Sequence, residues 1–147
     1  MPQECNISII TVNYNGLKDT CALIDTIPLN DPSLEVIVVD NASREDEAAL
    51  ISERYPNVKT VRSTKNLGFA GGNNLGIEAA HGKYLYFINN DTEFRDGWNV
   101  GALVQRLESA DRIAMVCPKI RFAWPPQPIQ FAGSPQLSAI TMRNQAI

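Results

Sequence analysis

The chain has 147 residues, of which 44% are hydrophobic and 20% are charged, and its formal net charge is −3. This length is sufficient for one compact domain with its own core, and the slight acidic excess argues against a nucleic-acid partner. No run approaches the roughly 20 apolar residues that span a bilayer, and the first residues lack the basic and apolar regions of a signal peptide.

Apolar runs and helical segments alternate along the first two thirds of the chain. β-Branched and apolar runs predict strands over residues 7–12, 34–39, 58–62 and 84–88. Helices are predicted over residues 17–26, 44–55, a segment that ends near residue 80, and 97–109. Ser43, with Asp46 three residues later, resembles a capping box at the start of the second helix.

The region after residue 110 is less regular. We predict a fifth strand over residues 113–117, a loop at the proline-rich residues 124–128, and a short strand within 127–132. Strands that alternate with helices indicate an α/β fold, with a mostly parallel sheet and helices on both faces. In such sheets, ligands bind outside the carboxyl ends of the strands.

Cysteine and histidine usage restricts the kinds of site. The number of cysteines is odd, and the three residues, Cys5, Cys21 and Cys117, lie far apart in the sequence. No Cys-x-x-Cys motif occurs. We interpret them as reduced thiols of a cytoplasmic protein, which argues against a zinc site or a disulfide framework. His81 is the only histidine, so sites built from several histidines are excluded. Its position just before Gly82 favours a role at the end of a helix, opposite the helix dipole.

Polar clusters follow four of the predicted strands, at residues 13–15, 40–41, 63–66 and 89–91. A single cluster would carry little weight. Because the carboxyl ends of parallel strands meet at one edge of the sheet, four clusters predict a binding site along that edge. In the last cluster, the apolar run 84–88 leads directly into Asn89, Asn90 and Asp91.

Asp91 is the best candidate for a metal ligand. Mg²⁺ or Mn²⁺ needs few protein carboxylates when substrate phosphates and water complete its coordination shell. Such an ion neutralises the charge on a departing diphosphate. The plain alternative for Asp91 is a solvated aspartate in a turn.

Tyr14 and Asp40 are candidates for contacts to a nucleoside. The Tyr14 ring can stack on a nucleobase, although a lone aromatic residue is more often packed in the protein. The Asp40 carboxylate can accept hydrogen bonds from a base N–H or a ribose hydroxyl, but a turn or helix-cap role explains it equally well.

The glycines Gly68, Gly71 and Gly72 match neither the dinucleotide fingerprint nor the P-loop. We expect this loop and the helix start after it to lie beside a pyrophosphate or sugar. The plain alternative is a tight loop before a helix.

Four segments together resemble family 2 glycosyltransferases, which have the GT-A fold. Each segment is moderately specific, and the ordered set, which covers the chain to about Phe94, is highly specific. The likeness is strongest to bacterial rhamnosyltransferase-like members that build surface polysaccharide. The segments are Ile9 to Asn15, Val38 to Ser43, Asn66 to Asn74 and Asn89 to Thr92.

The resemblance implies a nucleotide-diphosphate sugar donor, UDP- or dTDP-linked, and inverting transfer to a glycan or lipid-linked acceptor with Mg²⁺ or Mn²⁺. It places Tyr14 and Asp40 at the nucleoside, and Asn66 and the glycine loop near the donor. Residues 89–91 stand for the family's Asp-x-Asp motif, and Asp91 is the charged ligand that remains. The expected donor-binding residues are Asn13, Tyr14, Asn15, Asp40, Asn41, Asn66, Gly68, Gly71, Asn74, Asn89 and Asn90.

Members of this family are about twice as long, and their general base is a carboxylate well downstream of the metal motif. Glu93, Glu108 and Asp111 do not match that position. We therefore predict that residues 1–147 form a single donor-binding domain that lacks the acceptor-binding part with the base. A homodimer and a peripheral contact with the inner face of the cell membrane stay open.

Three other interpretations make different predictions. A nucleotide-sugar-binding remnant without turnover also predicts nucleotide binding, but no transfer. A nucleotidyltransferase would normally have a basic, glycine-rich loop after the first strand, and here no positive charge occurs before Lys18. A non-catalytic interaction domain leaves the four clusters at the strand ends unexplained.

Overall fold

The computed structural model describes residues 6–95 and 99–132. The chain divides between residues 98 and 99 into two compact units, which are described separately. The prediction of a single domain over residues 1–147 stays a prediction.

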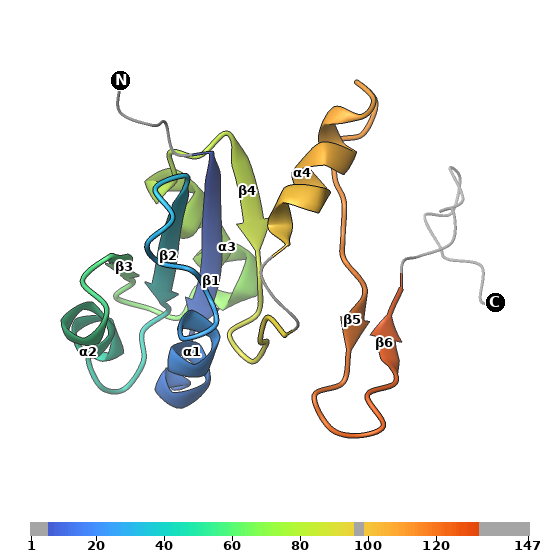
Figure 1. Ribbon diagram of the computed structural model, residues 1–147. Helices are drawn as coiled ribbons and strands as arrows, with labels where there is room; N and C mark the ends of the chain where they lie inside the picture. The colour runs from blue at the N-terminus through green and yellow to red at the C-terminus, as the bar shows by residue number, and fades with distance from the viewer. Residues whose placement is uncertain (1–5, 96–98, 133–147) are drawn as a thin grey trace, which may run out of the picture. The chain divides into compact units, whose positions relative to one another are not determined.

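The first unit is an α/β layer structure (Figure 1). Its sheet has the strand order β3-β2-β1-β4, and every neighbouring pair is parallel. This confirms the predicted parallel sheet, and the four strands predicted between residues 7 and 88 are each found within one residue of their expected bounds. The elements in chain order are β1 (Ile7–Asn13), α1 (Leu17–Ile24), β2 (Leu34–Asp40), α2 (Glu47–Arg54), β3 (Val58–Arg62), α3 (Gly68–Ala79) and β4 (Tyr84–Phe87).

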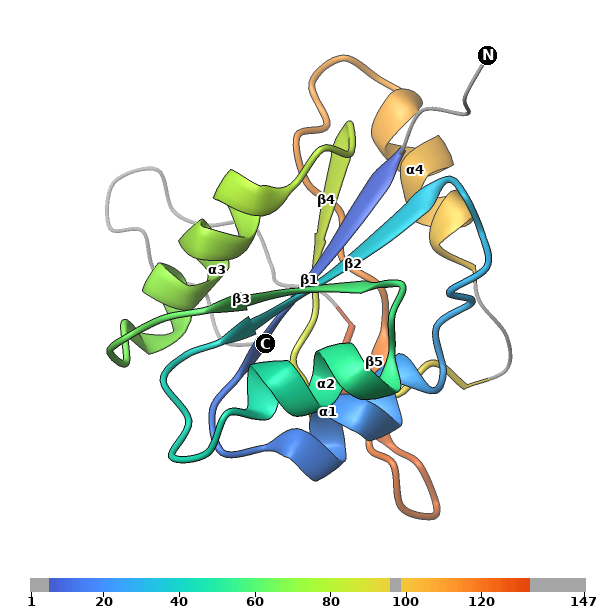
Figure 2. The same ribbon diagram turned by 90° about the vertical axis from the view of Figure 1, so that its left-hand side faces the viewer.

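Helices cover both faces of this sheet: α3 lies on one face, and α1 and α2 lie on the other (Figure 2). Alternate strand residues supply the two apolar faces. On the α3 side, the fully buried Ile10, Ile37 and Val39 pack with Leu75 and Ala79. Burying each large aliphatic side chain contributes about 1.5–3 kcal/mol to folding, so the central strands β1 and β2 dominate the stability of the layer.

Glycines bring α3 very close to the sheet. A Cβ on Gly76 would lie 2.3 Å from Ile10 Cγ2, and one on Gly72 would lie 2.8 Å from Val12 Cγ1. The glycine-rich segment was expected to be a loop before a helix, but α3 already begins at Gly68. That prediction was wrong because close packing on the sheet outweighs the poor intrinsic helix propensity of glycine.

The amino end of α2 also differs from the prediction. Asp46, not Ser43, is the N-cap, and its carboxylate accepts a hydrogen bond from Ala49 N–H at 3.0 Å. Ser43 Oγ instead accepts from Asn15 N–H at 2.9 Å. The expected capping box is therefore wrong, because Ser43 is used to join the β1–α1 loop to the β2–α2 loop.

The second unit contains α4 (Val100–Glu108) and an antiparallel pair, β5 (Ile120–Arg121) and β6 (Ile129–Phe131). The proline-rich segment connects these two strands, so the predicted loop and short strand are confirmed. The predicted strand over 113–117 is wrong: this run is irregular, and Met115 is 86% exposed. An apolar β-branched run supplies no hydrogen-bonding partner by itself, and the following Pro118 lacks an N–H. The predicted helix start at residue 97 lies outside the described residues.

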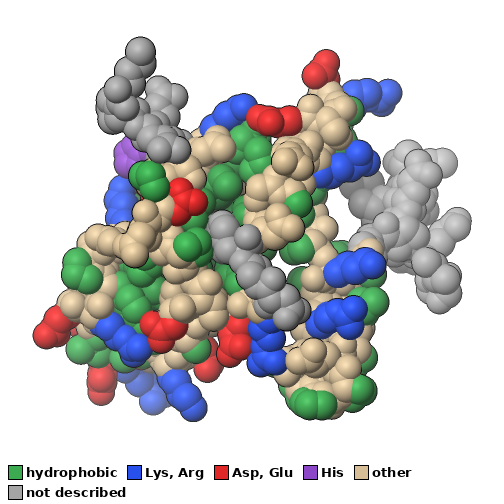
Figure 3. All heavy atoms as spheres, in the orientation of Figure 1, with side chains coloured by type: hydrophobic (Ala, Val, Ile, Leu, Met, Phe, Trp, Pro, Cys, Tyr) green, Lys and Arg blue, Asp and Glu red, His purple; other side chains and the backbone are tan. Residues whose placement is uncertain are grey.

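Charge is mixed over the surface: on the face shown in Figure 3, acidic and basic side chains lie interspersed. Among the described residues, no helix is both long enough and apolar enough to cross a membrane. Cys21 is a buried free thiol and Cys117 an exposed one, and Cys5 lies outside the described residues.

Candidate functional site

The carboxyl ends of the four parallel strands meet at one edge of the sheet. Asn13, Asp40 and Arg62 are register partners at the ends of β1, β2 and β3. A hollow of about 530 Å³ lies at this edge. The predicted convergence of the polar clusters is therefore confirmed, because each of the four contributes to its lining. The lining residues are Val12, Tyr14, Asn41, Asn66, Gly68, Phe69, Asn89, Asn90 and Asp91.

Two aromatic side chains at the hollow are largely exposed. Tyr14 follows β1 and is 51% exposed, and Phe69 lies in the first turn of α3 and is 65% exposed. Apolar rings that remain exposed cost hydrophobic free energy in the absence of a ligand. They supply flat surfaces for a planar or sugar ligand. Phe69 is not among the predicted site residues, although a phenylalanine among glycine, alanine and asparagine is a usable signal.

The segment after β4 presents Asp91 to the hollow. Asn89 O accepts from Thr92 N–H at 3.3 Å and from Thr92 Oγ1 at 2.5 Å, so residues 89–92 form a turn. Asn90 Nδ2 donates to Thr20 Oγ1 at 3.1 Å, which fixes the turn to α1. Asp91 is exposed. Its carboxylate is thus available to a ligand, on a turn that Asn90 anchors to α1.

Asn41 connects the end of β2 to the amino end of α3. Its Oδ1 accepts from Leu67 N–H at 2.9 Å, and its Nδ2 donates to Asn66 Oδ1 at 3.0 Å and to Gly68 O at 3.1 Å. Asn66 Oδ1 also accepts from Gly68 N–H at 2.8 Å. The side chains of Asn41 and Asn66 are therefore engaged with the backbone that lines the hollow.

The Asn13 side chain lies inside the protein and is hydrogen-bonded to other side chains. It is fully buried, and its Oδ1 accepts from Thr20 Oγ1 at 2.8 Å. Its Nδ2 donates to Glu47 Oε2 at 2.7 Å and lies 3.3 Å from Ser43 Oγ. Because both ends of the amide are satisfied inside the protein, Asn13 ties the end of β1 to α1 and α2 and does not line the hollow.

Asn15 shapes the loop that follows β1. Its backbone φ is +52°, which asparagine tolerates better than most residues. Its Oδ1 accepts from Arg44 N–H at 2.9 Å. Asn15 is exposed but lies outside the lining of the hollow.

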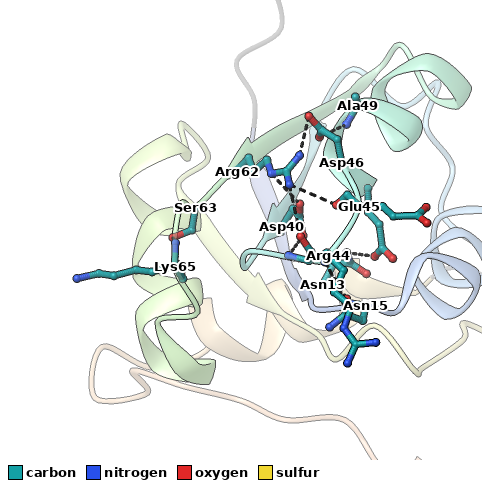
Figure 4. A network of polar contacts seen from close by, with 12 residues as sticks. Asn13, Asn15, Asp40, Arg44, Glu45, Asp46, Ala49, Arg62, Ser63 and Lys65 are labelled. Atoms are coloured by element: carbon teal, nitrogen blue, oxygen red, sulfur yellow. Dashed lines mark hydrogen bonds and ion pairs between the residues drawn. The ribbon is translucent and has the colours of Figure 1, made fainter.

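Asp40 is completely buried at the centre of a polar network (Figure 4). Its Oδ1 accepts from Ser43 N–H at 3.1 Å, and its Oδ2 lies 3.5 Å from Arg62 Nε. Arg62 also pairs with Asp46 through a 2.6 Å contact of Nη1 with Oδ2. The Asp40 carboxylate is enclosed, whereas Asn41, the next residue, lines the hollow. The expected contact of Asp40 with a nucleoside stays a prediction.

The structure thus sorts the predicted site residues into two sets. Gly71 lies against Leu67, so that a Cβ at Gly71 would be 2.6 Å from Leu67 Cβ. Asn74 is exposed on α3. The residues that line the hollow are Tyr14, Asn41, Asn66, Gly68, Asn89, Asn90 and Asp91, and those that do not are Asn13, Asn15, Asp40, Gly71 and Asn74.

The residues at the hollow can bind a hard cation only together with a ligand that supplies further oxygen atoms. Within residues 6–95 and 99–132, no group of three or more His, Cys, Asp or Glu could hold a metal ion. One exposed carboxylate flanked by amide oxygens fits Mg²⁺ or Mn²⁺ when phosphate oxygens and water complete the shell. The lining residues include no Lys or Arg, so an anionic ligand needs another source of positive charge, which the amino end of α3 supplies in part.

The architecture is that of GT-A glycosyltransferases, as the solved structures show. The mannosyltransferase PcManGT of Pyrobaculum calidifontis, solved with GDP-Man and Mn²⁺, superposes with a TM-score of 0.61 at 21% identity, over 81% of this chain and 34% of that one. TarS of S. aureus, solved with UDP-GlcNAc, gives a TM-score of 0.54 at 27% identity, over 70% of this chain and 30% of that one.

Residues 8–132 match glycosyl transferase family 2, so the chain belongs to that family. It is 30% identical to the amylovoran biosynthesis glycosyltransferase AmsB of Erwinia amylovora over 119 residues, which are 76% of this chain and 38% of AmsB. The chain therefore spans less than two fifths of this relative's length. The resemblance stated from the four segments is confirmed at the level of the family.

Proposed function

We propose that the chain is the donor-binding part of an inverting glycosyltransferase that takes a UDP- or dTDP-linked sugar with Mg²⁺ or Mn²⁺. The observation that carries the proposal is the hollow at the carboxyl edge of the sheet, where Tyr14, Asn66, Gly68 and Asp91 come together. Membership of the family and relatives solved with UDP-GlcNAc and GDP-Man support a nucleotide-sugar ligand.

Several residues at the hollow have a task in this proposal. The exposed Tyr14 ring stacks on the nucleobase, and the Gly68 backbone at the start of α3 faces the donor. Phe69 offers an apolar surface to the sugar. Asp40 acts indirectly, by holding the turn that presents Asn41.

Asp91, with the amide oxygens of Asn89 and Asn90 beside it, is the proposed metal ligand. The bound ion would neutralise charge on the diphosphate as it leaves. The Mn²⁺ in the PcManGT structure supports a divalent ion in this fold. With one carboxylate only, we expect weak affinity for the metal alone and stronger affinity once donor phosphates are present.

In the transfer reaction, an acceptor hydroxyl oxygen attacks the anomeric carbon, the bond from that carbon to the diphosphate oxygen breaks, and the hydroxyl proton passes to a general base. Glu93, the carboxylate nearest in sequence to Asp91, pairs with Arg95 at 3.2 Å. We propose that the base belongs to the acceptor-binding part that longer relatives contain. The single-domain assignment over residues 1–147 belongs to the same proposal.

The acceptor in this proposal is a glycan or a lipid-linked sugar of a surface polysaccharide. The names of AmsB and of the succinoglycan protein ExoO of Rhizobium meliloti support polysaccharide synthesis. The rhamnosyltransferase-like subtype, a cytoplasmic location, peripheral membrane contact and a homodimer stay predictions.

A binding module without turnover is the second candidate, because Glu93, the carboxylate next to the proposed metal site in sequence, pairs with Arg95 and is not placed as a base. It predicts the same nucleotide affinity without sugar transfer. Purified protein mixed with a sugar donor and a simple acceptor tests where the general base lies, because transfer at an ordinary rate by this chain alone would contradict both the binding module and the assignment of the base to the acceptor-binding part.

Calorimetric titration with UDP, dTDP and GDP, each with and without Mn²⁺, tests the proposed donor site. Binding of at least one nucleotide that strengthens in Mn²⁺ supports it. ADP serves as the control for non-specific nucleotide affinity. Absence of binding by all of the diphosphates at millimolar concentration contradicts a donor site formed by this chain.

A further inference from the structure

We propose that Asn41 is a positioning residue, which holds the amino-terminal end of α3 at the hollow and does not itself read the nucleotide. This inference rests on the proposed function, because it assigns a task within the proposed donor site. It differs from the direct donor contact that the sequence predicted for Asn41.

The Asn41 side chain is committed to one short segment. All three of its hydrogen bonds go to residues 66–68, at 2.9, 3.0 and 3.1 Å. Two of the partners are backbone groups of fixed polarity, since Leu67 N–H can only donate and Gly68 O can only accept. They fix the orientation of the amide and leave Nδ2 with no hydrogen for a ligand.

The bonds are partly buried, and their buried side is the Asn41 side chain. Asn41 is 3% exposed, and hydrogen bonds in such surroundings are stronger than those at the surface. The segment that they hold includes Gly68, whose φ of +70° turns the chain into α3. Asn41 therefore fixes the point at which the loop after β3 becomes a helix.

Holding this segment places two parts of the hollow at once. Gly68, which accepts a hydrogen bond from Asn41, and Phe69, the next residue, both line it. A first turn that moved away from β2 would displace the Phe69 ring and the free N–H groups of α3 together. The task requires a side chain with one acceptor and two donors, which asparagine has and aspartate lacks.

Asn41→Asp separates positioning from direct contact with the base. A carboxylate that touched a base N–H would keep or strengthen that bond, since charge-assisted hydrogen bonds are the stronger ones. In the positioning role, aspartate keeps only the bond from Leu67 N–H and sets a negative charge beside Gly68 O and Asn66 Oδ1. We expect UDP affinity in Mn²⁺ to fall by about tenfold or more.

The matched control is Asn57→Asp, the same chemical change at an exposed residue just before β3, at the other edge of the sheet. It should bind UDP as wild type does. Hydrogen exchange of peptides spanning residues 66–72 should be faster in Asn41→Asp and unchanged in Asn57→Asp. Wild-type affinity together with wild-type exchange in Asn41→Asp overturns the inference.

A measurement on the wild-type protein covers the case in which Asn41→Asp does not fold. The amide of Leu67, bonded only to the Asn41 side chain among the contacts described, should be protected from exchange without ligand. Exchange at the rate of an open loop overturns the inference. If the wild type binds none of UDP, dTDP and GDP, the proposed function is contradicted instead. The titration of the wild type alone shows that outcome.

Discussion

The Asp40 carboxylate and the Arg62 guanidinium face each other at the ends of neighbouring strands, with Oδ2 3.5 Å from Nε. Asp40 is completely buried, whereas the Arg62 side chain is 37% exposed. Oδ2 accepts no hydrogen bond from the described residues. Arg62 is therefore the main source of positive charge for a carboxylate that water does not reach.

Loss of this partner should destabilise the fold. Arg62→Met keeps much of the side-chain volume but leaves the buried carboxylate unpaired, and we expect about 2–4 kcal/mol lower free energy of unfolding. Urea denaturation measures the difference. Arg54→Met is the control: Arg54 pairs with Asp25 where both side chains are at least half exposed, so its loss should cost less than about 1 kcal/mol. Equal effects of the two changes would contradict the assigned role of Arg62.

Gly76 is required by the close approach of α3 to β1. In Gly76→Ala, the new methyl group would lie 2.3 Å from Ile10 Cγ2, so either the helix or Ile10 has to move. We expect a loss of about 2–4 kcal/mol, at or above the usual range for an overpacked core. The same change at Gly101 in α4 meets open space and should stabilise that helix by about 0.5–1 kcal/mol. Thermal unfolding monitored by circular dichroism compares the two variants.

Ala42 is strained in the turn between β2 and α2. Its φ is +66°, a conformation that glycine adopts readily and β-branched residues adopt poorly. Ala42→Gly should leave stability unchanged or raise it by up to about 1 kcal/mol, and Ala42→Val should lower it by about 1–2 kcal/mol. The order Gly, Ala, Val in chemical denaturation midpoints is the expected result, and the reverse order would refute the turn geometry.

Glu35 links the amino ends of β1, β2 and β4 on the edge opposite the hollow. Partial burial opposes its ionisation, but hydrogen bonds from Ser8 Oγ, His81 N–H and Gly82 N–H outweigh burial and lower the pKa of Glu35 below its ordinary value. The unfolded chain therefore binds a proton at a higher pH than the folded protein does. The stabilisation is fully present above the unfolded pKa of roughly 4.5 and is lost as pH falls through the folded pKa.

Glu35→Gln tests this contribution. The glutamine variant should be less stable than wild type at pH 7, and the difference should shrink as pH is lowered from 5 to 3, because only the wild-type side chain titrates. Urea midpoints across this range give the comparison. A difference that stays constant with pH would show that the charge of Glu35 contributes nothing.

Much of the fold follows from local patterns in the sequence. The β-branched runs at residues 7–12 and 34–39 are long and apolar enough to fix the central strands, and alternation with helices fixes their parallel direction. That regularity is also sufficient to bring Tyr14, Asn66 and Asp91 to one edge. The strand expected at residues 113–117 failed because strand formation depends on a partner that no local pattern specifies.

The parts of the site that could not be predicted depend on packing. Asp40 and Asn41 are adjacent polar residues, and the sequence does not show which of them faces the hollow. The structure turns Asp40 towards Ser43 and Arg62 and turns Asn41 towards α3. Likewise, Gly72 belongs to a helix only because its missing Cβ lets α3 approach Val12.

The most direct test of the donor site compares UDP binding by wild type, Asp91→Asn and the control Glu53→Gln, each with and without Mn²⁺. Glu53 is exposed on α2, outside the hollow. The account predicts that Mn²⁺ strengthens binding by wild type and the control, and that Asp91→Asn loses about tenfold or more of this gain. It also predicts that all three share the same weak affinity without metal. Equal Mn²⁺-dependent gains in wild type and Asp91→Asn would contradict the assignment of Asp91 and the metal-assisted site built on it.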